Sequence, residues 1–303
     1  MLPVYTLQDL ISRDRLDAGA DKPARLAVLG HPIAHSFSPQ MHQPALDAAG
    51  IDARYIRLEV EPGKMADAFA HMRALGFIGC NVTIPHKLDA LSSCSEVHPD
   101  AKSLGAVNTV RFDDNGSHGF NTDGPGFVRA ILDEFDESLS MLKVAVIGAG
   151  GGAGQAIATQ CAMQGVEKLL VVNRSVEKLG PLSARLQALG PISEIIALSF
   201  DDPALQEQCL DCDLIVNTTS VGLKPGDPSI LPATCFKRGH LVYDTIYQPA
   251  VTPLLALANE IGCRTGNGSS LLLHQGALAF QHWFPETDPL QVMRQAIATR
   301  FVS

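Results

Sequence analysis

The feature of this sequence that most limits its fold is a run of glycines between two apolar segments. Residues 143–148 have the composition of a buried parallel strand, and residues 149–154 form a glycine-rich turn. Residues 155–165 have helical composition, and a second apolar strand follows at 169–172. A strand, a glycine turn, a helix and a strand in this order predict one βαβ unit of a dinucleotide-binding fold.

Strand-like and helix-like segments alternate along most of the chain. We expect further strands at residues 26–29, 55–60, 79–82, 107–112, 195–198, 213–217 and 241–244. We expect helices at 39–49, 64–75, 94–103, 123–135, 178–189, 271–284 and 296–301. Such alternation is typical of the α/β class, in which helices cover mostly parallel sheets.

This order of elements predicts two α/β domains. The first comprises residues 1–125 and 265–303, with a mostly parallel sheet onto which the C-terminal helices pack back. The second comprises residues 126–264 and contains the glycine turn in a Rossmann-like sheet. We expect the first to bind the substrate, the second to bind the cofactor, and the active site to lie in the cleft between them.

Composition excludes several classes of function. With a net charge of −9, the 303-residue chain lacks the positive charge that broad binding of nucleic acid requires. No apolar stretch approaches the roughly 20 residues of a membrane-spanning helix, and residues 1–25 hold no apolar signal core. The seven cysteines have no framework spacing, so we expect reduced thiols and a cytoplasmic location. We predict a small-molecule partner, neither nucleic acid nor membrane, and a monomer or a homodimer.

Neither the histidines nor the cysteines predict a metal site. His31, His35 and His42 lack the helical i, i+4 pairing and neighbouring acid of a zinc-binding motif. Cys209 and Cys212 form a lone CxxC before a predicted strand, and not at a helix N-terminus, where a thiolate is favoured. We therefore expect no metal, and we interpret these cysteines as small buried apolar residues.

The glycine turn has the properties of a phosphate-binding site. Glycines let the backbone approach a pyrophosphate, and the N-terminus of the following helix offers free N–H groups and a positive dipole. The preferred register is Gly148-x-Gly150-x-x-Ala153. The predicted cofactor-binding residues of the turn are Gly148, Ala149, Gly150, Gly151, Gly152 and Ala153.

The end of the next strand indicates which dinucleotide binds. NAD-binding proteins place an acid there to accept the ribose hydroxyls, but this chain has Asn173, Arg174 and Ser175, with Lys178 one turn further. An arginine at this position pairs with a 2′-phosphate, and no acid competes for it. The sequence therefore favours NADP(H) over NAD(H).

Four polar clusters lie at predicted strand ends of the first domain. Ser36 and Ser38 follow the first strand on a proline-rich turn, and Lys87 ends a second polar segment. Asn108 and Asp123 mark the third and fourth clusters. Each residue alone has a structural explanation, as a surface lysine, a turn residue or a helix N-cap. Four clusters beside a dinucleotide fold indicate one site, because α/β sheets bind ligands at the carboxyl ends of their strands.

Together these segments resemble the ordered motifs of one known family, the shikimate dehydrogenases. The resemblance begins near Arg25 and covers nearly all of the remaining chain. The similar segments are Gly30–Pro39, Asn81–Lys87, Gly105–Thr109, Asn121–Gly124, Gly148–Ala153, Asn173–Ser175, Asn217–Gly222, Asp244–Leu255 and Gly268–Ala277. Their combination is far more specific than any single segment.

The resemblance implies an enzyme that reversibly reduces 3-dehydroshikimate to shikimate with NADPH, in the pathway through chorismate to the aromatic amino acids. Ser36 and Ser38 match the serines that hold the substrate carboxylate, which two hydroxyl donors can do without adding charge. The residues that match binders of the ring hydroxyls, or lie near them, are Thr83, Asn108, Tyr247 and Gln275. Thr245 and Gly268 match positions beside the cofactor.

Lys87 and Asp123 match the catalytic pair of the family. The chemistry asks for the same two groups, because hydride addition to a ketone builds negative charge on its oxygen. A nearby ammonium stabilises that charge and supplies the proton. A neighbouring carboxylate orients the ammonium and accepts a hydrogen bond from a hydroxyl.

Several positions depart from the family pattern. Gln43 stands where Asn is common, and Ser270 and Leu271 occupy positions that are usually Gly and Met. Thr245 replaces a Met or another apolar residue near the nicotinamide, and the glycine turn is one residue longer than usual. About two dozen residues precede the family's usual start and have no predicted role.

Three other functions fit parts of the sequence. A broader quinate/shikimate dehydrogenase is the nearest, since polar pocket residues do not exclude the extra hydroxyl of quinate. A non-catalytic shikimate-binding regulator would keep the fold without the chemistry, but the presence of both Lys87 and Asp123 argues against it. A metal-dependent hydrolase would be sensitive to chelators, which we do not expect.

Overall fold

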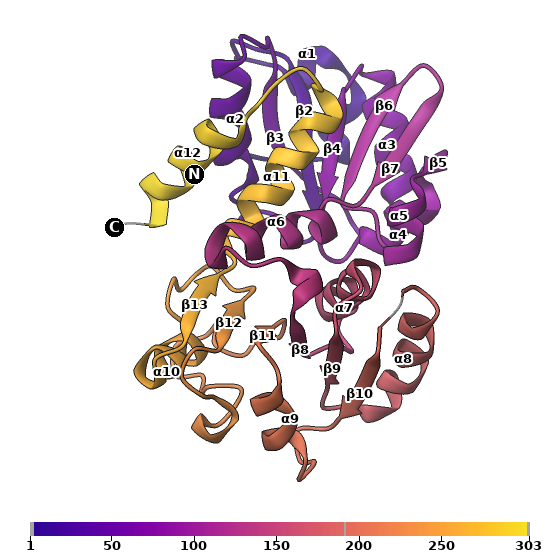
Figure 1. Cartoon of the computed structure of the whole chain (residues 1–303). Coiled ribbons are helices and arrows are strands. Elements are labelled where there is room, and N and C mark those ends of the chain that lie inside the picture. The colour runs from indigo at the N-terminus through magenta and orange to yellow at the C-terminus, as the bar shows by residue number, and fades with distance from the viewer. Residues whose placement is uncertain (1–2, 191, 302–303) are drawn as a thin grey trace. The chain divides into compact units, whose positions relative to one another are not determined.

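The computed structural model describes residues 3–190 and 192–301, without the side chains of residues 300 and 301. The chain divides into two compact units, each with its own sheet (Figure 1). The first unit comprises the chain up to Thr122 together with the chain from Gln275 onward. The second unit comprises Asp123–His274.

In the described part of the chain, the first unit has a seven-stranded sheet in the order β1-β3-β2-β4-β6-β7-β5. Its strands are β1 (Val4–Thr6), β2 (Ala24–Gly30), β3 (Arg54–Glu59), β4 (Gly79–Val82), β5 (Glu96–Val97), β6 (Thr109–Asp113) and β7 (Gly116–Phe120). Strand β6 pairs antiparallel with both neighbours, whereas the other described pairs are parallel. The start of β6 therefore lies at the same sheet edge as the ends of β4 and β7.

Helices cover both faces of this first sheet. One face packs on η1 (Leu7–Ile11), α1 (Arg13–Leu16), α3 (Met65–Ala74), α4 (Lys87–Ser93) and α5 (Pro99–Leu104). The other face meets α2 (Ser38–Ala48) and the C-terminal helix α11 (Ser269–Trp283), where His42 stacks on Tyr55 and Trp283 donates to the Val110 carbonyl. Helix α12 (Leu290–Phe301) packs on α2. The prediction that the C-terminal helices pack back on the first domain is confirmed.

The second unit has a sheet in which every described pair is parallel, in the order β10-β9-β8-β11-β12-β13. The strands are β8 (Lys143–Ile147), β9 (Lys168–Val172), β10 (Glu194–Leu198), β11 (Leu214–Asn217), β12 (Leu241–Asp244) and β13 (Arg264–Asn267). The strand order reverses beside β8, whose neighbours are β9 and β11. In open α/β sheets, a ligand binds outside the carboxyl ends of the strands at such a reversal.

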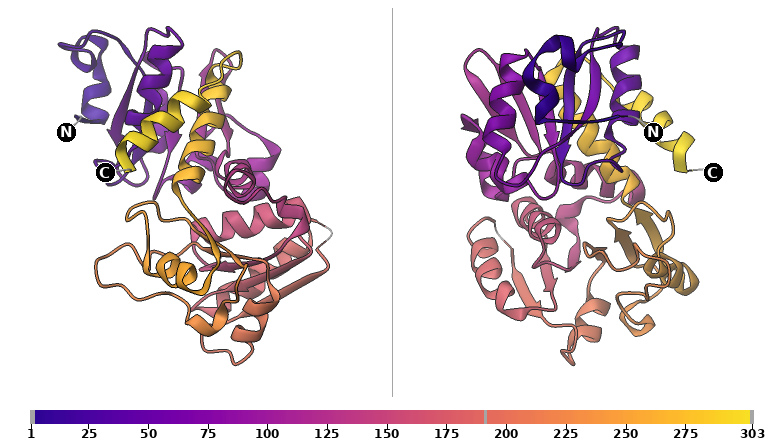
Figure 2. Two further views of the ribbon diagram at one scale, coloured as in Figure 1. Left: turned by 60° about the vertical axis from the view of Figure 1, so that its left-hand side comes forward. Right: turned by 180° about the vertical axis from the view of Figure 1, so that it is seen from behind.

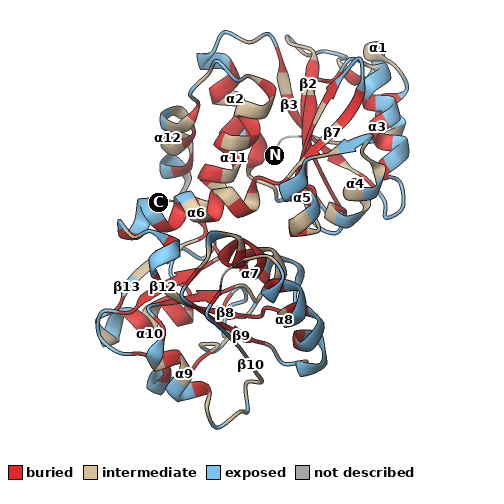
Figure 3. Ribbon diagram, turned by 45° about the vertical axis from the view of Figure 1, so that its right-hand side comes forward, coloured by how far each residue is buried: buried red, intermediate tan, exposed pale blue. Residues whose placement is uncertain are grey.

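Side chains of the second sheet alternate between two cores, and helices cover both faces of this sheet (Figure 2). Val144 and Val146 of β8 face a core shared with α6 (Asp123–Phe135), η2 (Leu139–Met141), α7 (Gly152–Gln164) and α8 (Leu179–Gln187). Ala145 and Ile147 face a second core with α9 (Leu205–Asp211), η4 (Ala233–Cys235) and α10 (Pro253–Ile261). Strands buried on both faces (Figure 3) explain the continuous apolar runs in this half of the sequence.

The predicted α/β class with mostly parallel sheets is confirmed, but one predicted element is wrong. Residues 94–103 do not form one continuous helix: α4 ends at Ser93, the two-residue strand β5 follows, and the helix α5 begins only at Pro99. The physical reason is Pro99, which fixes a helix start at its own position and disfavours helix in the residue before it. The sequence prediction did not include β1, β13 or the helical elements η1, α1, α4, α9 and α10, and it gave no direction for β6.

Candidate functional site

The serine turn, residues 31–38, leaves the end of β2 and enters α2. The Ser36 hydroxyl donates to Ser38 Oγ and accepts from the Ser38 backbone N–H, both at 3.3 Å. Ser38 is the first residue of α2 and Pro39 the second, a position where the fixed φ of proline suits a helix start. Ser36 is half-buried, and Ser38 is 8% exposed. The two hydroxyls are thus held beside each other at a helix N-terminus.

The predicted substrate residue Thr83 lies beside this turn. A Cβ on Gly30, at the end of β2, would lie only 2.7 Å from Thr83 Cγ2, so only glycine fits there. The Thr83 N–H donates to the Leu29 carbonyl at 2.8 Å, and the His31 N–H donates to the Ile84 carbonyl at 3.2 Å. The structure therefore brings the first and second polar clusters together.

A buried network of hydrogen bonds joins the other polar clusters of the first unit. Asn81 Nδ2 donates to Thr109 Oγ1 at 3.2 Å, and Thr109 Oγ1 donates to Asn108 Oδ1 at 3.1 Å. Asn108 in turn bonds Thr122, donating to its hydroxyl at 3.0 Å and accepting from its N–H at 2.8 Å. Because each member holds its neighbour, the Asn108 side chain has a fixed orientation.

Lys87 and Asp123 each begin a helix at the edge of this network. Lys87 starts α4, and its carbonyl accepts from the N–H of Val107, the residue before Asn108, at 3.0 Å. Asp123 starts α6 and directly follows Thr122 in the chain. Both side chains are half-buried. The carboxylate at the first turn of α6 is favoured by the helix dipole.

The last two predicted substrate residues come from different units. Gln275 belongs to the first unit on α11, where a Cβ on the adjacent Gly276 would lie 2.1 Å from Met41 Cε of α2. Gln275 therefore lies one residue from the contact of α11 with the helix that follows the serine turn. Tyr247 belongs to the second unit after β12, and burial raises the pKa of its hydroxyl.

The glycine turn of the second unit connects β8 to α7. Gly148 has a φ of 90°, and Gly151 is the N-cap of α7. A Cβ on Gly150 would lie 2.4 Å from Asn173 Nδ2, and a Cβ on Gly154 would lie 2.3 Å from the Gly148 carbonyl oxygen. The glycine that lets the helix approach the turn is thus Gly154, one position beyond the predicted register, because this turn holds one extra residue.

Predicted cofactor residues that are distant in sequence lie at this same sheet edge. Asn173 follows β9, and its Nδ2 donates to the Ser175 carbonyl at 3.0 Å, which shapes the loop that carries Arg174. Arg174 and Lys178 are exposed. A Cβ on Gly268 would lie 2.0 Å from the Thr245 carbonyl oxygen, so these two residues are neighbours. The narrow glycine turn and the nearby cations fit the pyrophosphate and the extra phosphate of NADP(H).

Sequence reasoning missed several residues that support these sites. Asp244 accepts from Asn217 Nδ2 at 3.1 Å, from Thr252 Oγ1 at 2.7 Å and from the Ile246 N–H at 3.0 Å. Burial raises the pKa of Asp244, against the effect of these bonds. The sequence signal that could have identified Asp244 as a supporting residue is its carboxylate, which comes directly at the end of an apolar strand.

In the first unit, Tyr55 and Arg57 were also missed. The Tyr55 hydroxyl donates to Asn81 Oδ1 at 2.6 Å and also hydrogen-bonds the Ser38 side chain. Both residues lie in the interior of β3, where an apolar strand is the simplest interpretation. Their alternation within the strand was the only signal, because it places both on one face.

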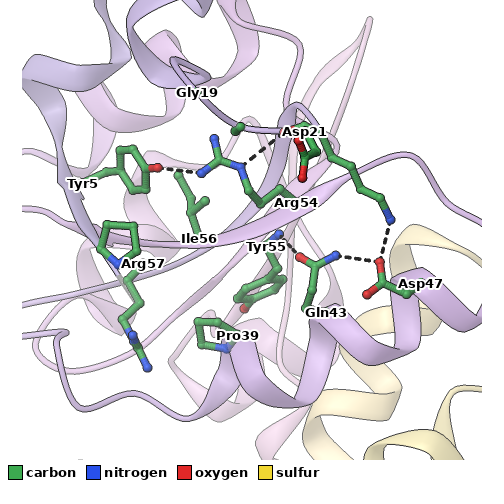
Figure 4. Close-up of a pocket in the computed structure, with 13 residues that line it drawn as sticks. Tyr5, Gly19, Asp21, Pro39, Gln43, Asp47, Arg54, Tyr55, Ile56 and Arg57 are labelled. Carbon is green, nitrogen blue, oxygen red and sulfur yellow. Dashed lines mark hydrogen bonds and ion pairs between the residues drawn. The ribbon is translucent and has the colours of Figure 1, made fainter. Parts of the chain in front are cut away.

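A pocket of about 500 Å³ lies elsewhere in the first unit, between the N-terminal segment, α2 and β3 (Figure 4). It contains none of the predicted site residues. Its polar side chains bond one another: Arg54 donates to Tyr5 at 2.6 Å, and Lys22 and Gln43 donate to Asp47 at 2.6 and 3.1 Å. The Arg54–Tyr5 and Lys22–Asp47 bonds fasten the N-terminal segment, residues 3–22, to the rest of the unit.

None of the described helices is both long and apolar enough to span a membrane. Within the same residues, no three His, Cys, Asp or Glu side chains are grouped so that they could hold a metal ion.

The fold and these residues together define an α/β dehydrogenase with a dinucleotide-binding unit. The family model of the shikimate dehydrogenase substrate binding domain matches residues 28–110. The NADP⁺-dependent shikimate dehydrogenase of Methanopyrus kandleri is 36% identical over 274 residues, which are 90% of this chain and 94% of that protein. The chain therefore belongs to the shikimate dehydrogenase family.

Solved structures agree with this assignment. The shikimate 5-dehydrogenase of Thermus thermophilus in complex with NADP(H) and shikimate has a TM-score of 0.80 at 34% identity, covering 91% of this chain and 99% of that one. The quinate dehydrogenase of Corynebacterium glutamicum in complex with NAD has a TM-score of 0.81 at 28% identity, covering 92% of this chain and 100% of that one. The fold thus occurs in enzymes named for two related substrates, one in complex with NADP(H) and the other with NAD.

Proposed function

We propose that this chain catalyses the reversible, NADPH-dependent reduction of 3-dehydroshikimate to shikimate, in the pathway to chorismate and the aromatic amino acids. The chain is an NADP-dependent oxidoreductase of the shikimate dehydrogenase family. The observation that carries the proposal is the set of polar residues at one edge of the first sheet, Ser36, Ser38, Thr83, Asn108 and Lys87. They provide donors for a carboxylate and for ring hydroxyls beside one ammonium group.

Substrate binding begins at the serine turn. Ser36 and Ser38 donate to the two carboxylate oxygens, and a hydroxyl pair held 3.3 Å apart suits a bidentate anion. Thr83 and Asn108 bind ring hydroxyls, with further contacts from Gln275 and Tyr247. The network behind Asn108 keeps its amide oriented before the substrate arrives, which lowers the entropic cost of binding.

Lys87 and Asp123 are the proposed catalytic residues. NADPH, when bound, supplies the hydride. The Lys87 ammonium stabilises the negative charge that develops on the carbonyl oxygen and donates its proton there, while Asp123 orients the ammonium and accepts a hydrogen bond from a ring hydroxyl. Both residues begin helices whose first turns are fixed by the backbone around Asn108 and Thr122.

NADP(H) is the proposed cofactor, bound by the second unit. The glycine turn and the N-terminus of α7 contact its pyrophosphate, and Arg174 and Lys178 contact its 2′-phosphate. The loop that carries Arg174 has no acid at positions 173–175 to accept ribose hydroxyls. Thr245 and Gly268, which lie side by side, complete this set.

We also propose a cytoplasmic enzyme that is a monomer or a homodimer. All seven cysteines are free, as expected in a reducing compartment. Light scattering after size exclusion measures the oligomeric state.

A broader quinate/shikimate dehydrogenase is the second candidate, favoured by the similarity to a quinate dehydrogenase that binds NAD. Oxidation of shikimate and of quinate, each with NADP⁺ and with NAD⁺, separates the two. We expect the highest kcat/KM for shikimate with NADP⁺. Brisk turnover of quinate with NAD⁺ and little turnover of shikimate would reject the proposed substrate.

The catalytic assignment has its own test in Lys87→Ala. This variant should lose roughly three orders of magnitude or more in kcat while the Kd for shikimate stays within about threefold. Calorimetry measures the Kd and a stopped assay measures the residual rate. An unchanged rate would support a binding protein without this chemistry, and reject Lys87 as a catalytic residue.

A further inference from the structure

Arg57 connects the interior of β3 to the serine turn. Its side chain is 3% exposed, and its Nε and Nη2 both donate to the Ser36 carbonyl oxygen, at 2.9 and 2.6 Å. Nη2 also donates to Gln40 Oε1 at 3.1 Å, in the first turn of α2. One guanidinium therefore holds the chain on both sides of Ser38.

We propose that Arg57 is a positioning residue that fixes the Ser36 hydroxyl for the substrate carboxylate. This inference rests on the proposed function, in which Ser36 binds that carboxylate. Arg57 contacts the Ser36 backbone, so it acts through Ser36.

The geometry explains why an arginine stands here. Two N–H groups that converge on one carbonyl oxygen fix the plane of the peptide that follows Ser36. Together with the ψ angle of Ser36, that plane limits the direction of the Ser36 Cα–Cβ bond, and hence the region that its hydroxyl can reach. A lysine offers one ammonium on a flexible stem and cannot make the same planar fork. Because the bonds are partly buried, water competes for them less than at the surface, and they hold the turn more firmly than surface bonds would.

The charge of Arg57 adds to this effect. The two serine hydroxyls carry no net charge, whereas the bound substrate carries a carboxylate. A guanidinium is protonated at all physiological pH values, so Arg57 provides a permanent positive charge behind the turn. The turn thus combines neutral donors, which direct the carboxylate, with a cation that favours its approach.

Arg54 on the same strand is a matched control. Its guanidinium donates to Tyr5 at 2.6 Å and to Leu16 O and Asp17 Oδ1 at 3.0 Å, all in the N-terminal segment. Figure 4 shows Arg54 reaching Tyr5 while Arg57 extends away from that contact. Arg54 makes a comparable number of hydrogen bonds from the same strand, and none of these bonds goes to the serine turn.

The experiment measures steady-state oxidation of shikimate by NADP⁺ in the full-length enzyme. Arg57→Met should raise the KM for shikimate about 10- to 100-fold, with kcat at saturation within about threefold and the KM for NADP⁺ within about twofold. Arg57→Lys should recover part of the loss, because charge returns without the fork. Arg54→Lys should lower the melting temperature but leave the KM for shikimate within about twofold.

Ser36→Ala links the inference to its target. The double variant Ser36→Ala/Arg57→Lys should have a KM for shikimate within about threefold of Ser36→Ala alone, because residues that act through one group are not additive. If the two increases multiply, or if Arg57→Lys and Arg57→Met keep the wild-type KM, Arg57 does not act on this turn. If Arg57→Met does not fold, the Arg57→Lys variant decides the matter.

The same measurements keep the two proposals apart. A raised KM in Ser36→Ala with a normal KM in both Arg57 variants rejects the role of Arg57 and leaves the proposed function intact. A normal KM in Ser36→Ala rejects the proposed substrate site itself, and with it the role of Arg57. An equal rise in the KM values for shikimate and NADP⁺ in Arg57→Lys indicates a general structural defect and also rejects the inference.

Discussion

The polar cluster of the first unit and the glycine turn of the second are held in place by different means. Asn81, Thr109, Asn108 and Thr122 form a chain of buried side-chain hydrogen bonds. The glycine turn depends on backbone: its shape follows from Gly148 at φ 90° and from the absence of side chains at Gly150 and Gly154. Substitutions should therefore impair the two sites differently. In the first unit they should disturb the orientation of the binding side chains, and in the second unit an added side chain should exclude the cofactor sterically.

The largest effect that we expect in this comparison is on the glycine turn. In Gly154→Val, the new Cβ would lie 2.3 Å from the Gly148 carbonyl oxygen and 2.7 Å from Thr218 Oγ1, so α7 must move away from the turn. We expect affinity for NADP⁺ to fall about 100-fold, while affinity for shikimate stays within about twofold. Calorimetric titration with each ligand measures both affinities.

Gly180→Ala is the control for this variant. Gly180 lies in α8, and a Cβ there meets no atom within 4 Å. The substitution should stabilise the protein by up to about 1 kcal/mol through helix propensity, with no change in affinity for NADP⁺. If Gly154→Val and the wild type bind NADP⁺ with equal affinity, the cofactor site does not depend on the absence of a side chain at Gly154.

A smaller effect on the same unit should come from the exposed cation of the β9 loop. Arg174→Ala should lower kcat/KM for NADP⁺ about 10- to 30-fold, because a charge-assisted bond to the 2′-phosphate is lost. The value for NAD⁺ should change by less than about threefold, since NAD⁺ lacks that phosphate. A parallel loss with both cofactors would place Arg174 outside the 2′-phosphate site.

On the substrate side, Thr109→Val tests whether the network orients Asn108. The variant removes a hydroxyl that bonds both Asn81 and Asn108, and leaves buried polar groups with fewer partners. We expect unfolding in urea to require about 2 kcal/mol less free energy and the KM for shikimate to rise about threefold to tenfold. The KM for NADP⁺ should stay constant.

Thr299→Val provides the matched threonine control. The Thr299 hydroxyl donates to the Gln295 carbonyl on the exposed side of α12. Loss of that bond should change the free energy of unfolding by about 0.5 kcal/mol or less. If Thr109→Val and Thr299→Val lower the free energy of unfolding equally, the buried bonds of Thr109 contribute no more to stability than an exposed bond does.

The smallest effect that we expect is on the pH dependence of stability, through His42 in the core between α2 and β3 of the first unit. His42 is completely buried and stacks on Tyr55 with ring centroids 4.5 Å apart, and burial lowers its pKa from 6.5 to about 3. Between these two values the unfolded chain binds a proton that the folded chain does not, so stability falls as pH falls. Above about pH 7 the residue is neutral in both states and makes no such contribution.

His42→Phe isolates this contribution. Between pH 7.0 and 5.5 the wild type should lose about 1 kcal/mol more unfolding free energy than the variant. Urea unfolding at the two pH values measures the difference. Parallel losses in the two proteins would show that His42 accepts a proton in the folded state, and that this core is less closed than its burial indicates.

The buried strands and long helices of the second unit could be predicted from the sequence, whereas its shorter elements α9, α10 and β13 could not. Strand β12 and helix α6 have the predicted bounds, because a parallel sheet covered on both faces leaves unbroken apolar runs and sharp helix starts. In the first unit, β5 is too short to leave a pattern, and β7 carries Ser117 and His118. The N-terminal segment could not be placed at all, because its edge pairing with β3 depends on contacts some 50 residues away.

The candidate site shows the same division. The strand-end positions of Ser36, Thr83, Asn108 and the glycine turn follow from sequence motifs, and the structure brings those of the first unit to one sheet edge. The contacts of Arg57 with Ser36 could not be predicted, because they span 21 residues and join a strand interior to a turn. Supporting residues of this kind leave no spacing rule in a single sequence.

The reversed strand β6 has a consequence for how this region can vary. Strands β6 and β7 form a hairpin in which Thr109 lies opposite Phe120. Asn108, just before the hairpin, and Thr122, just after it, therefore lie at the same edge of the sheet, where they hydrogen-bond each other. Extra residues at the tip, around 114–115, would lengthen the loop far from that edge and leave the two ends facing each other. A single residue inserted within either strand would turn every following side chain to the opposite face and separate the ends. Natural variation in length should therefore collect at the hairpin tip and be excluded from its two arms.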